Sequence, residues 1–118
     1  MENGRSAGWQ PYEDGATLGR KGTEGGQIIR DEEHPAGGRI TLERDCLRVP
    51  YAITCGIYGW MVHTRFIADE PTAIHEYERM KPALTEIMNQ IPGVEDPEAE
   101  QKADTASEAI ARFVEQFA

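Results

Sequence analysis

The chain of 118 residues is poor in cysteine and has no long apolar run. Cys46 and Cys55 are its only cysteines, too few for a disulfide framework, so we expect a cytoplasmic protein with reduced thiols. Its most apolar stretch, residues 51–67, is interrupted by a histidine and an arginine, which argues against a membrane span. No basic segment followed by an apolar one opens the chain, so a secretory signal is not expected.

Basic side chains are also scarce. Lys and Arg number 12 against 21 Asp and Glu, which gives a net charge of −9. Nucleic acids and anionic membranes both require a positive face, so neither is an expected partner. Residues 68–118 hold twelve acidic and four basic side chains, and thus −8 of the total. This acidity is expected to coat the outer faces of helices; a basic partner protein is the alternative.

Glycine divides the chain into two parts. Residues 1–26 contain seven of the twelve glycines, which predicts an irregular N-terminal arm. Trp9 and Tyr12 are exceptions that would pin this arm to the rest. Residues 27–118 are predicted to form a single α+β domain.

Two strand-like runs follow the arm, residues 27–34 and 39–46, and the turn-forming residues between them predict a hairpin. Two registers are open, one pairing His34 with Arg39 and one placing Asp31 opposite Glu43. Residues 51–67 are rich in β-branched and aromatic residues but too long for one straight strand. We favour one strand bent at its glycines over a second hairpin. We therefore expect an antiparallel sheet of about three to four strands over residues 27–67.

Two helices are predicted after the sheet, packed on one of its faces. Asp69 is a helix-capping residue followed by Pro71, and apolar residues recur every three or four positions up to Ile91. Pro82 lies off this apolar face, so we expect it to bend the helix, although an end near Lys81 is the alternative. The second helix is predicted to begin after residues 96–98 and carries a narrow apolar seam up to Phe117.

Strand alternation divides the charged stretch before the first turn. Arg30, Glu32 and His34 share one face, which separates them from Asp31 and Glu33. Only residues on the same face can converge on one ligand. The favoured interpretation is a solvated hairpin end in which arginines neutralise the acids.

A metal site is the minority hypothesis for this stretch. Glu32 and His34 could each donate one ligand to zinc or iron, and His63 from a neighbouring strand could supply the third. A spacing of two on a strand is common by chance, so no metal is expected. Neither "GRKGTEGG" at 19–26 nor "HEYE" at 75–78 completes a cofactor or metal motif. The first is predicted to be a flexible linker, and no cofactor is expected.

A second candidate site lies in residues 51–67. His63 and Arg65 share one strand face beside apolar residues, and together could bind a carboxylate or phosphate ligand. Cys55 joins them if the strand bends. A Cys–His nucleophile would need hydrogen-bond reach and an orienting third group, which the sequence does not indicate.

The leading functional hypothesis is therefore a non-catalytic domain that binds a protein or a small ligand. One alternative is a small metal-dependent enzyme or metal-binding domain that uses Glu32, His34 and His63. Another is a purely structural module that forms a homodimer, because a small domain gains stability by sharing apolar surface.

Overall fold

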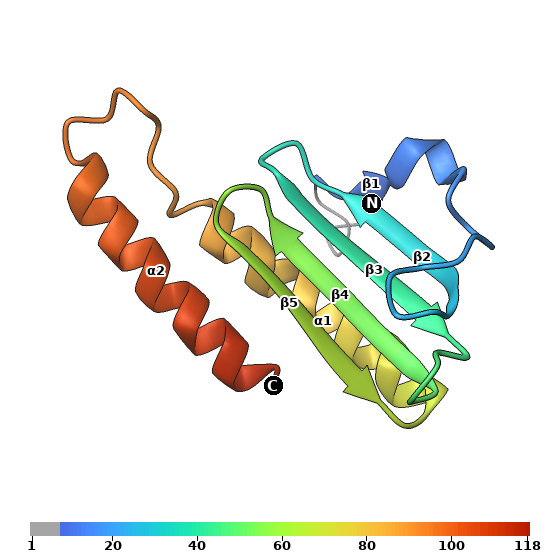
Figure 1. The fold of residues 1–118 in the computed structure, drawn as a ribbon. Helices are drawn as coiled ribbons and strands as arrows, with labels where there is room; N and C mark the ends of the chain where they lie inside the picture. Colours follow the sequence, from blue (N-terminus) through green and yellow to red (C-terminus); the bar gives the residue numbers. More distant parts are fainter. Residues whose placement is uncertain (1–7) are drawn as a thin grey trace.

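Five antiparallel strands and two long helices make up the part of the chain, residues 8–118, that the computed structural model describes (Figure 1). The strands follow one another across the sheet in the order β1-β2-β3-β4-β5. Their bounds are β1 Gln10–Pro11, β2 Gln27–Glu33, β3 Gly38–Arg44, β4 Tyr51–Ile57 and β5 Met61–Ile67. Helices α1 Glu70–Met88 and α2 Ala99–Gln116 come last. The α+β class is confirmed, with five strands where three to four were expected.

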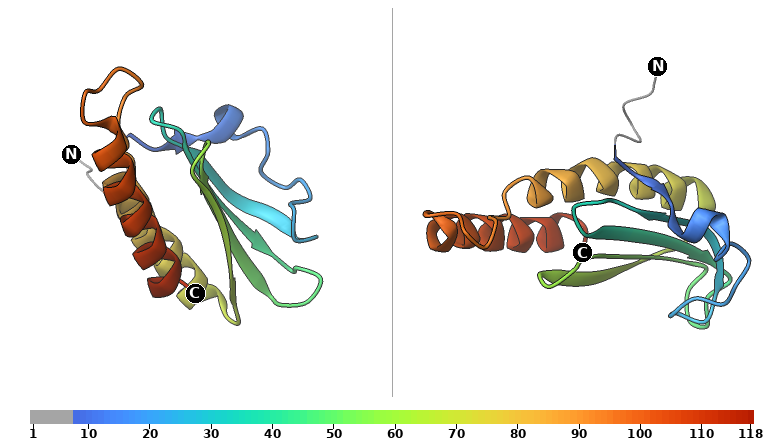
Figure 2. Two further views of the ribbon diagram at one scale, coloured as in Figure 1. Left: turned by 60° about the vertical axis from the view of Figure 1, so that its left-hand side comes forward. Right: turned by 90° about the horizontal axis from the view of Figure 1, so that it is seen from above.

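The core lies between the sheet and α1. Alternate residues of β3 and β4 point toward α1, and Ile40, Leu42 and Ile53 are fully buried there. From α1, Tyr77 and Leu84 fill the other side of this layer and are also fully buried. Complete burial of one such side chain contributes about 1.5–3 kcal/mol. Both helices lie on the same side of the sheet (Figure 2), which leaves the opposite face free of helices.

The expectation of a single bent strand over residues 51–67 is wrong. The segment forms a second hairpin, β4 and β5, joined by Tyr58, Gly59 and Trp60. The connecting turn begins after Ile57, so Ile57 stays buried in β4 while Tyr58 and Gly59 lie at the exposed tip. Gly59 has φ +81°, a left-handed conformation that glycine adopts without strain. Gly56 lies inside β4 and pairs with Val62.

The first hairpin, β2 with β3, is confirmed, but neither register considered for it is correct. Glu33 pairs with Arg39, and His34 N donates to Gly38 O at 2.8 Å, so the loop holds three residues where four were expected. Gly37 takes φ +107° at the end of this loop. A β-bulge between Ile28 and Arg30 then shifts the pairing again. Favourable charge pairs indicate neither the length of the loop nor the presence of a bulge, so they could not predict the correct register.

The N-terminal arm lies against the body from residue 8 onward; its first seven residues are outside the described part. Trp9 is 6% exposed and its Nε1 donates to Thr85 Oγ1 of α1 at 3.0 Å. β1 then pairs with the end of β2 and contributes the unexpected fifth strand. A short 3-10 turn, Tyr12–Gly15, follows, and the chain returns along β2 through Arg20, whose carbonyl accepts from Ile28 N.

Both predicted helices are present, and α1 begins after Asp69 as expected. Asp69 Oδ1 accepts from Thr72 N at 2.9 Å, and α1 continues through exposed Pro82 to Met88. α2 runs beside α1 and past the β5 edge of the sheet (Figures 1 and 2), where Phe113 and Phe117 are buried. Within residues 8–118, neither helix contains a stretch apolar enough to cross a bilayer.

Candidate functional site

The face of the sheet that carries no helix is turned toward the viewer in Figure 1. Side chains alternate between the two faces of a strand. The residues between the core positions of β3, β4 and β5 therefore lie on this face, and most of them are polar or small. In strand order, they are Arg39, Thr41 and Glu43, then Ala52, Thr54 and Gly56, then Val62, Thr64 and Phe66.

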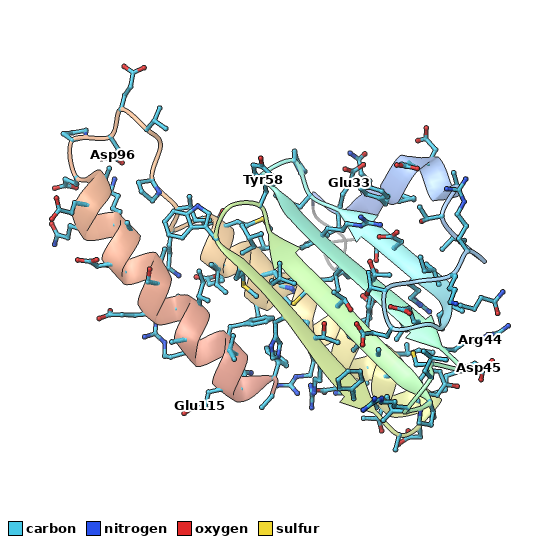
Figure 3. The ribbon with its side chains drawn as sticks, in the orientation of Figure 1. Glu33, Arg44, Asp45, Tyr58, Asp96 and Glu115 are labelled. Atoms are coloured by element: carbon cyan, nitrogen blue, oxygen red, sulfur yellow. The ribbon has the colours of Figure 1, made fainter. Side chains whose placement is uncertain are left out.

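Two hollows adjoin on this face and form what we call the sheet groove. The first, of about 560 Å³, lies between the returning arm and the middle of the sheet. The second, of about 750 Å³, lies between the tips of the two hairpins. Arg39, Gly56 and Val62 line both hollows, so the groove is continuous. In Figure 3, Tyr58 and Glu33 mark the end of the sheet at the hairpin tips.

Arg39 is held rigidly at the junction of the two hollows. Its Nε and Nη2 donate to the two carboxylate oxygens of Asp31 at 3.0 and 2.8 Å. Its guanidinium lies 3.6 Å from the ring centroid of Tyr12. The hydrogen bonds to Asp31 raise the pKa of Arg39 further above its usual value. The Asp31 side chain is 0% exposed and also accepts from the hydroxyls of Thr17 and Thr41 at 2.8 and 3.1 Å.

A glycine-rich loop, residues 22–26, forms one wall of the groove by closing around Glu43. This side chain is 1% exposed, and one of its oxygens accepts from Glu24 N and Gly26 N, both at 3.1 Å. A Cβ on Gly22 would run into the Glu43 carboxyl, and one on Gly26 would meet the Arg44 carbonyl oxygen at 2.5 Å. The prediction of a flexible linker is therefore corrected, because the segment is ordered around a buried carboxylate.

The charged residues of β2 divide between the two faces, as alternation predicted. Arg30 and Glu32 point toward α1, whereas Asp31 points into the groove side. Glu32 Oε1 accepts from Tyr77 Oη at 2.7 Å and from Lys81 Nζ at 3.0 Å. Arg30 donates to a glutamate of α1 rather than to its own hairpin. Burial, with the neighbouring Glu32 carboxylate, raises the pKa of Tyr77 far above its ordinary value.

His63 and Arg65 contact the C-terminal end of α2. His63 Nε2 donates to the Phe117 carbonyl oxygen at 2.7 Å, and the Arg65 guanidinium lies 5.7 Å from the Phe117 ring centroid. Arg65 and Arg79 both donate to Glu76. Burial opposes ionisation of Glu76, but these two arginines outweigh it, so the pKa of Glu76 is lowered. The cluster fastens α2 to α1 and β5.

Of the two remaining predicted residues, His34 is hydrogen-bonded and Cys55 is buried. His34 Nδ1 accepts from Ala36 N at 3.1 Å within the hairpin loop. The His34 ring lies edge-on to the Trp9 ring, with the two ring centroids 5.4 Å apart. Cys55 is 2% exposed, and burial raises the pKa of its thiol to about 12.

The structure does not bring Glu32, His34 and His63 together. Glu32, Ile40, Cys55 and His63 lie in one cross-strand row, so Glu32 and His63 are three strand spacings apart, roughly 14 Å. Within residues 8–118, no group of three histidine, cysteine, aspartate or glutamate side chains could hold a metal ion.

Sequence reasoning missed the groove residues, although the sequence carried a signal for them. In "RITLE" and "AITCG", apolar core positions alternate with Arg39, Thr41, Thr54 and Gly56, a pattern that places polar and small residues on one open face. Comparisons of the chain with protein-family models, with curated proteins and with solved structures give no match.

Proposed function

We propose that this chain is a non-catalytic binding domain that takes a small organic ligand in the sheet groove. One observation carries the proposal: two adjoining hollows of about 560 and 750 Å³ share lining residues on the face that the helices leave open. Small-molecule sites in proteins are typically concave and occupy about 300–1,000 Å³. The groove is therefore large enough for a ligand of that kind.

The groove supplies groups suited to recognition. Arg39 is fixed by Asp31 and Tyr12 before any ligand arrives, which reduces the entropy lost on binding. Thr54 and Thr64 have their hydroxyl oxygens 3.4 Å apart. Since only one hydroxyl hydrogen is needed between them, Thr54, which lines the first hollow, can donate its own to a ligand when Thr64 donates to Thr54.

The two histidines predicted as site residues are hydrogen-bonded to the backbone, and both cysteine thiols have raised pKa values, which supports a role without catalysis. Burial raises the pKa of Cys46 to about 11 and that of Cys55 to about 12, so neither thiol ionises appreciably at neutral pH. His34 and His63 each use a ring nitrogen in a hydrogen bond to the chain's own backbone.

The test blocks the groove with one side chain. Val62 is 81% exposed and lines both hollows, so Val62→Trp fills the groove without disturbing the core. Val94→Trp is the matched control, because Val94 is 100% exposed in the connection between α1 and α2. Saturation-transfer NMR with a panel of aromatic acids, amides and amines should detect binders for wild type and Val94→Trp, with the signals lost in Val62→Trp. Equal signals in both variants, or no binder at millimolar concentration, would contradict the proposal.

A second candidate is homodimerisation through β5, favoured by its position at the sheet edge with exposed Val62 and Phe66. If two copies pair antiparallel about Thr64, Val62 of one copy faces Phe66 of the other, an apolar cross-strand pair. Light scattering over a range of concentrations tests this. A dimer that Val62→Glu dissociates would support it, and a monomer at every concentration would exclude it.

A further inference from the structure

We infer that the ligand of the sheet groove is an organic anion, whose acidic group lies against Arg39 in the first hollow and whose apolar body extends toward Trp60 in the second. This inference rests on the proposed function, because it assigns a ligand class to the same groove.

The first hollow is basic. Arg20, Lys21 and Arg39 line the first hollow, and among residues 8–118 its only acidic lining residue is Glu43. The Glu43 carboxylate is buried and already accepts hydrogen bonds from two loop amides. On a protein of net charge −9, this hollow is therefore a basic exception. Opposite charge in a concave site raises the local concentration of an anionic ligand.

Within residues 8–118, the contacts of Arg39 leave it one free hydrogen-bond donor. Two of its nitrogens, Nε and Nη2, are bonded to Asp31, while Nη1 has no acceptor in the part of the chain that the structure describes. Asp31 offsets the charge of Arg39, so attraction of an anion depends mainly on Arg20 and Lys21. The role left to Arg39 is a positioned Nη1 donor, and charge-assisted hydrogen bonds of this kind favour carboxylate and phosphate oxygens.

The second hollow fixes the direction of the ligand. Tyr58, Trp60, Met61 and Val62 line it and offer aromatic and aliphatic surface. Glu33 also lines it, and a carboxylate there repels an acidic group. An anion with an apolar body therefore binds with its acid toward the arm and its body toward the hairpin tips.

The experiment compares 2-naphthoate with its neutral isostere 2-naphthamide, with inorganic phosphate as a third probe. Affinities are measured by NMR titration of wild type and the double variant Arg20→Gln/Lys21→Gln. Lys102→Gln/Arg112→Gln is the matched control, since it removes the same charge from α2, away from the groove. Arg39→Lys keeps the charge but removes the fixed guanidinium donor. All substituted groups are at least partly exposed, so folding should be retained.

The readout is the ratio of naphthoate to naphthamide affinity, which a purely structural change would not alter. Two exposed cations are expected to make the affinity for naphthoate about fivefold higher than that for naphthamide. This ratio should fall toward unity in Arg20→Gln/Lys21→Gln and on adding salt. It should persist in the α2 control. Arg39→Lys should also lower the ratio. If naphthamide binds as tightly as naphthoate, the groove stands and the inference fails. If neither aromatic probe binds, the inference fails, and the proposed function fails with it only if the wider panel of acids, amides and amines also gives no binder. Phosphate binding as strongly as naphthoate would refute the role given to the apolar body.

Discussion

Asp31 is the residue on which the arrangement of the groove depends most, and its replacement by alanine is the sharpest stability prediction. Its carboxylate is completely buried and accepts four hydrogen bonds, from Thr17, from Thr41 and twice from Arg39. The substitution removes the acceptor for all of them at once. Thr17, which is 7% exposed and belongs to the arm, loses its only bond to the sheet side chains.

The expected cost follows from these partners. Each hydroxyl left without its acceptor costs about 1 kcal/mol. Loss of the charge-assisted hydrogen bonds from Arg39 costs about 1.5–3 kcal/mol. The Arg39 side chain is 44% exposed and can be rehydrated by water, so the lower end applies to it. The free energy of unfolding should therefore fall by roughly 3–4 kcal/mol.

Urea unfolding, followed by circular dichroism and tryptophan fluorescence, measures this change. Thr41→Val removes one of the donors and should cost about 1 kcal/mol. Glu115→Ala removes an exposed acid of α2, labelled in Figure 3, and should change the stability by less than about 0.5 kcal/mol. A loss below about 1 kcal/mol for Asp31→Ala would refute the claim that this carboxylate holds Arg39 and the arm in place.

Three further outcomes are expected. Glu43→Gln weakens the acceptor for the loop at 22–26, so it should cost about 1 kcal/mol and speed limited proteolysis there; an unchanged cleavage rate would count against the loop's dependence on this carboxylate. Because the pKa of Glu76 is lowered in the fold, its stabilisation is present above about pH 4.5 and is lost as the pH falls through the folded pKa. Glu76→Gln should therefore flatten the acid side of the stability curve, and an unaltered acid slope would refute this. Cys55 should resist a thiol reagent at pH 8 until the protein unfolds and Cys46 should react slowly; reaction of both at the rate of a free thiol would contradict their raised pKa values.

The elements that local rules govern were predictable. Asp69 begins α1 because an aspartate before a proline-containing first turn satisfies the free backbone amides, and α1 passes Pro82 because that residue lies off the buried face. Alternation along β2 correctly separated Asp31 from Glu32. Each of these depends on spacing within one segment.

The elements that long-range contacts govern were not predictable. β1 is a strand only because Gln10 and Pro11 lie beside β2, and its two residues carry no pattern of their own. The β2–β3 register depends on a three-residue loop and a bulge, which charge pairing did not reveal.

The candidate site shows the same division. Sequence reasoning selected histidines and charged residues that share a strand face, yet His63 and Arg65 contact the chain's own α2. The groove instead depends on where the arm returns along β2 and closes around Glu43 of β3, and on the missing side chain at Gly56. That return is a tertiary contact which no periodicity encodes.

The most direct test of the central claim is a map of backbone amide chemical-shift changes during titration of the isotopically labelled chain with 2-naphthoate. Binding in the sheet groove predicts that the largest changes fall on Arg39, Thr54, Gly56 and Val62, with the amides of α2 unchanged, and that Val62→Trp abolishes them. Changes centred on α1 or α2, or a map that Val62→Trp leaves intact, would contradict the assignment of the groove as the binding site.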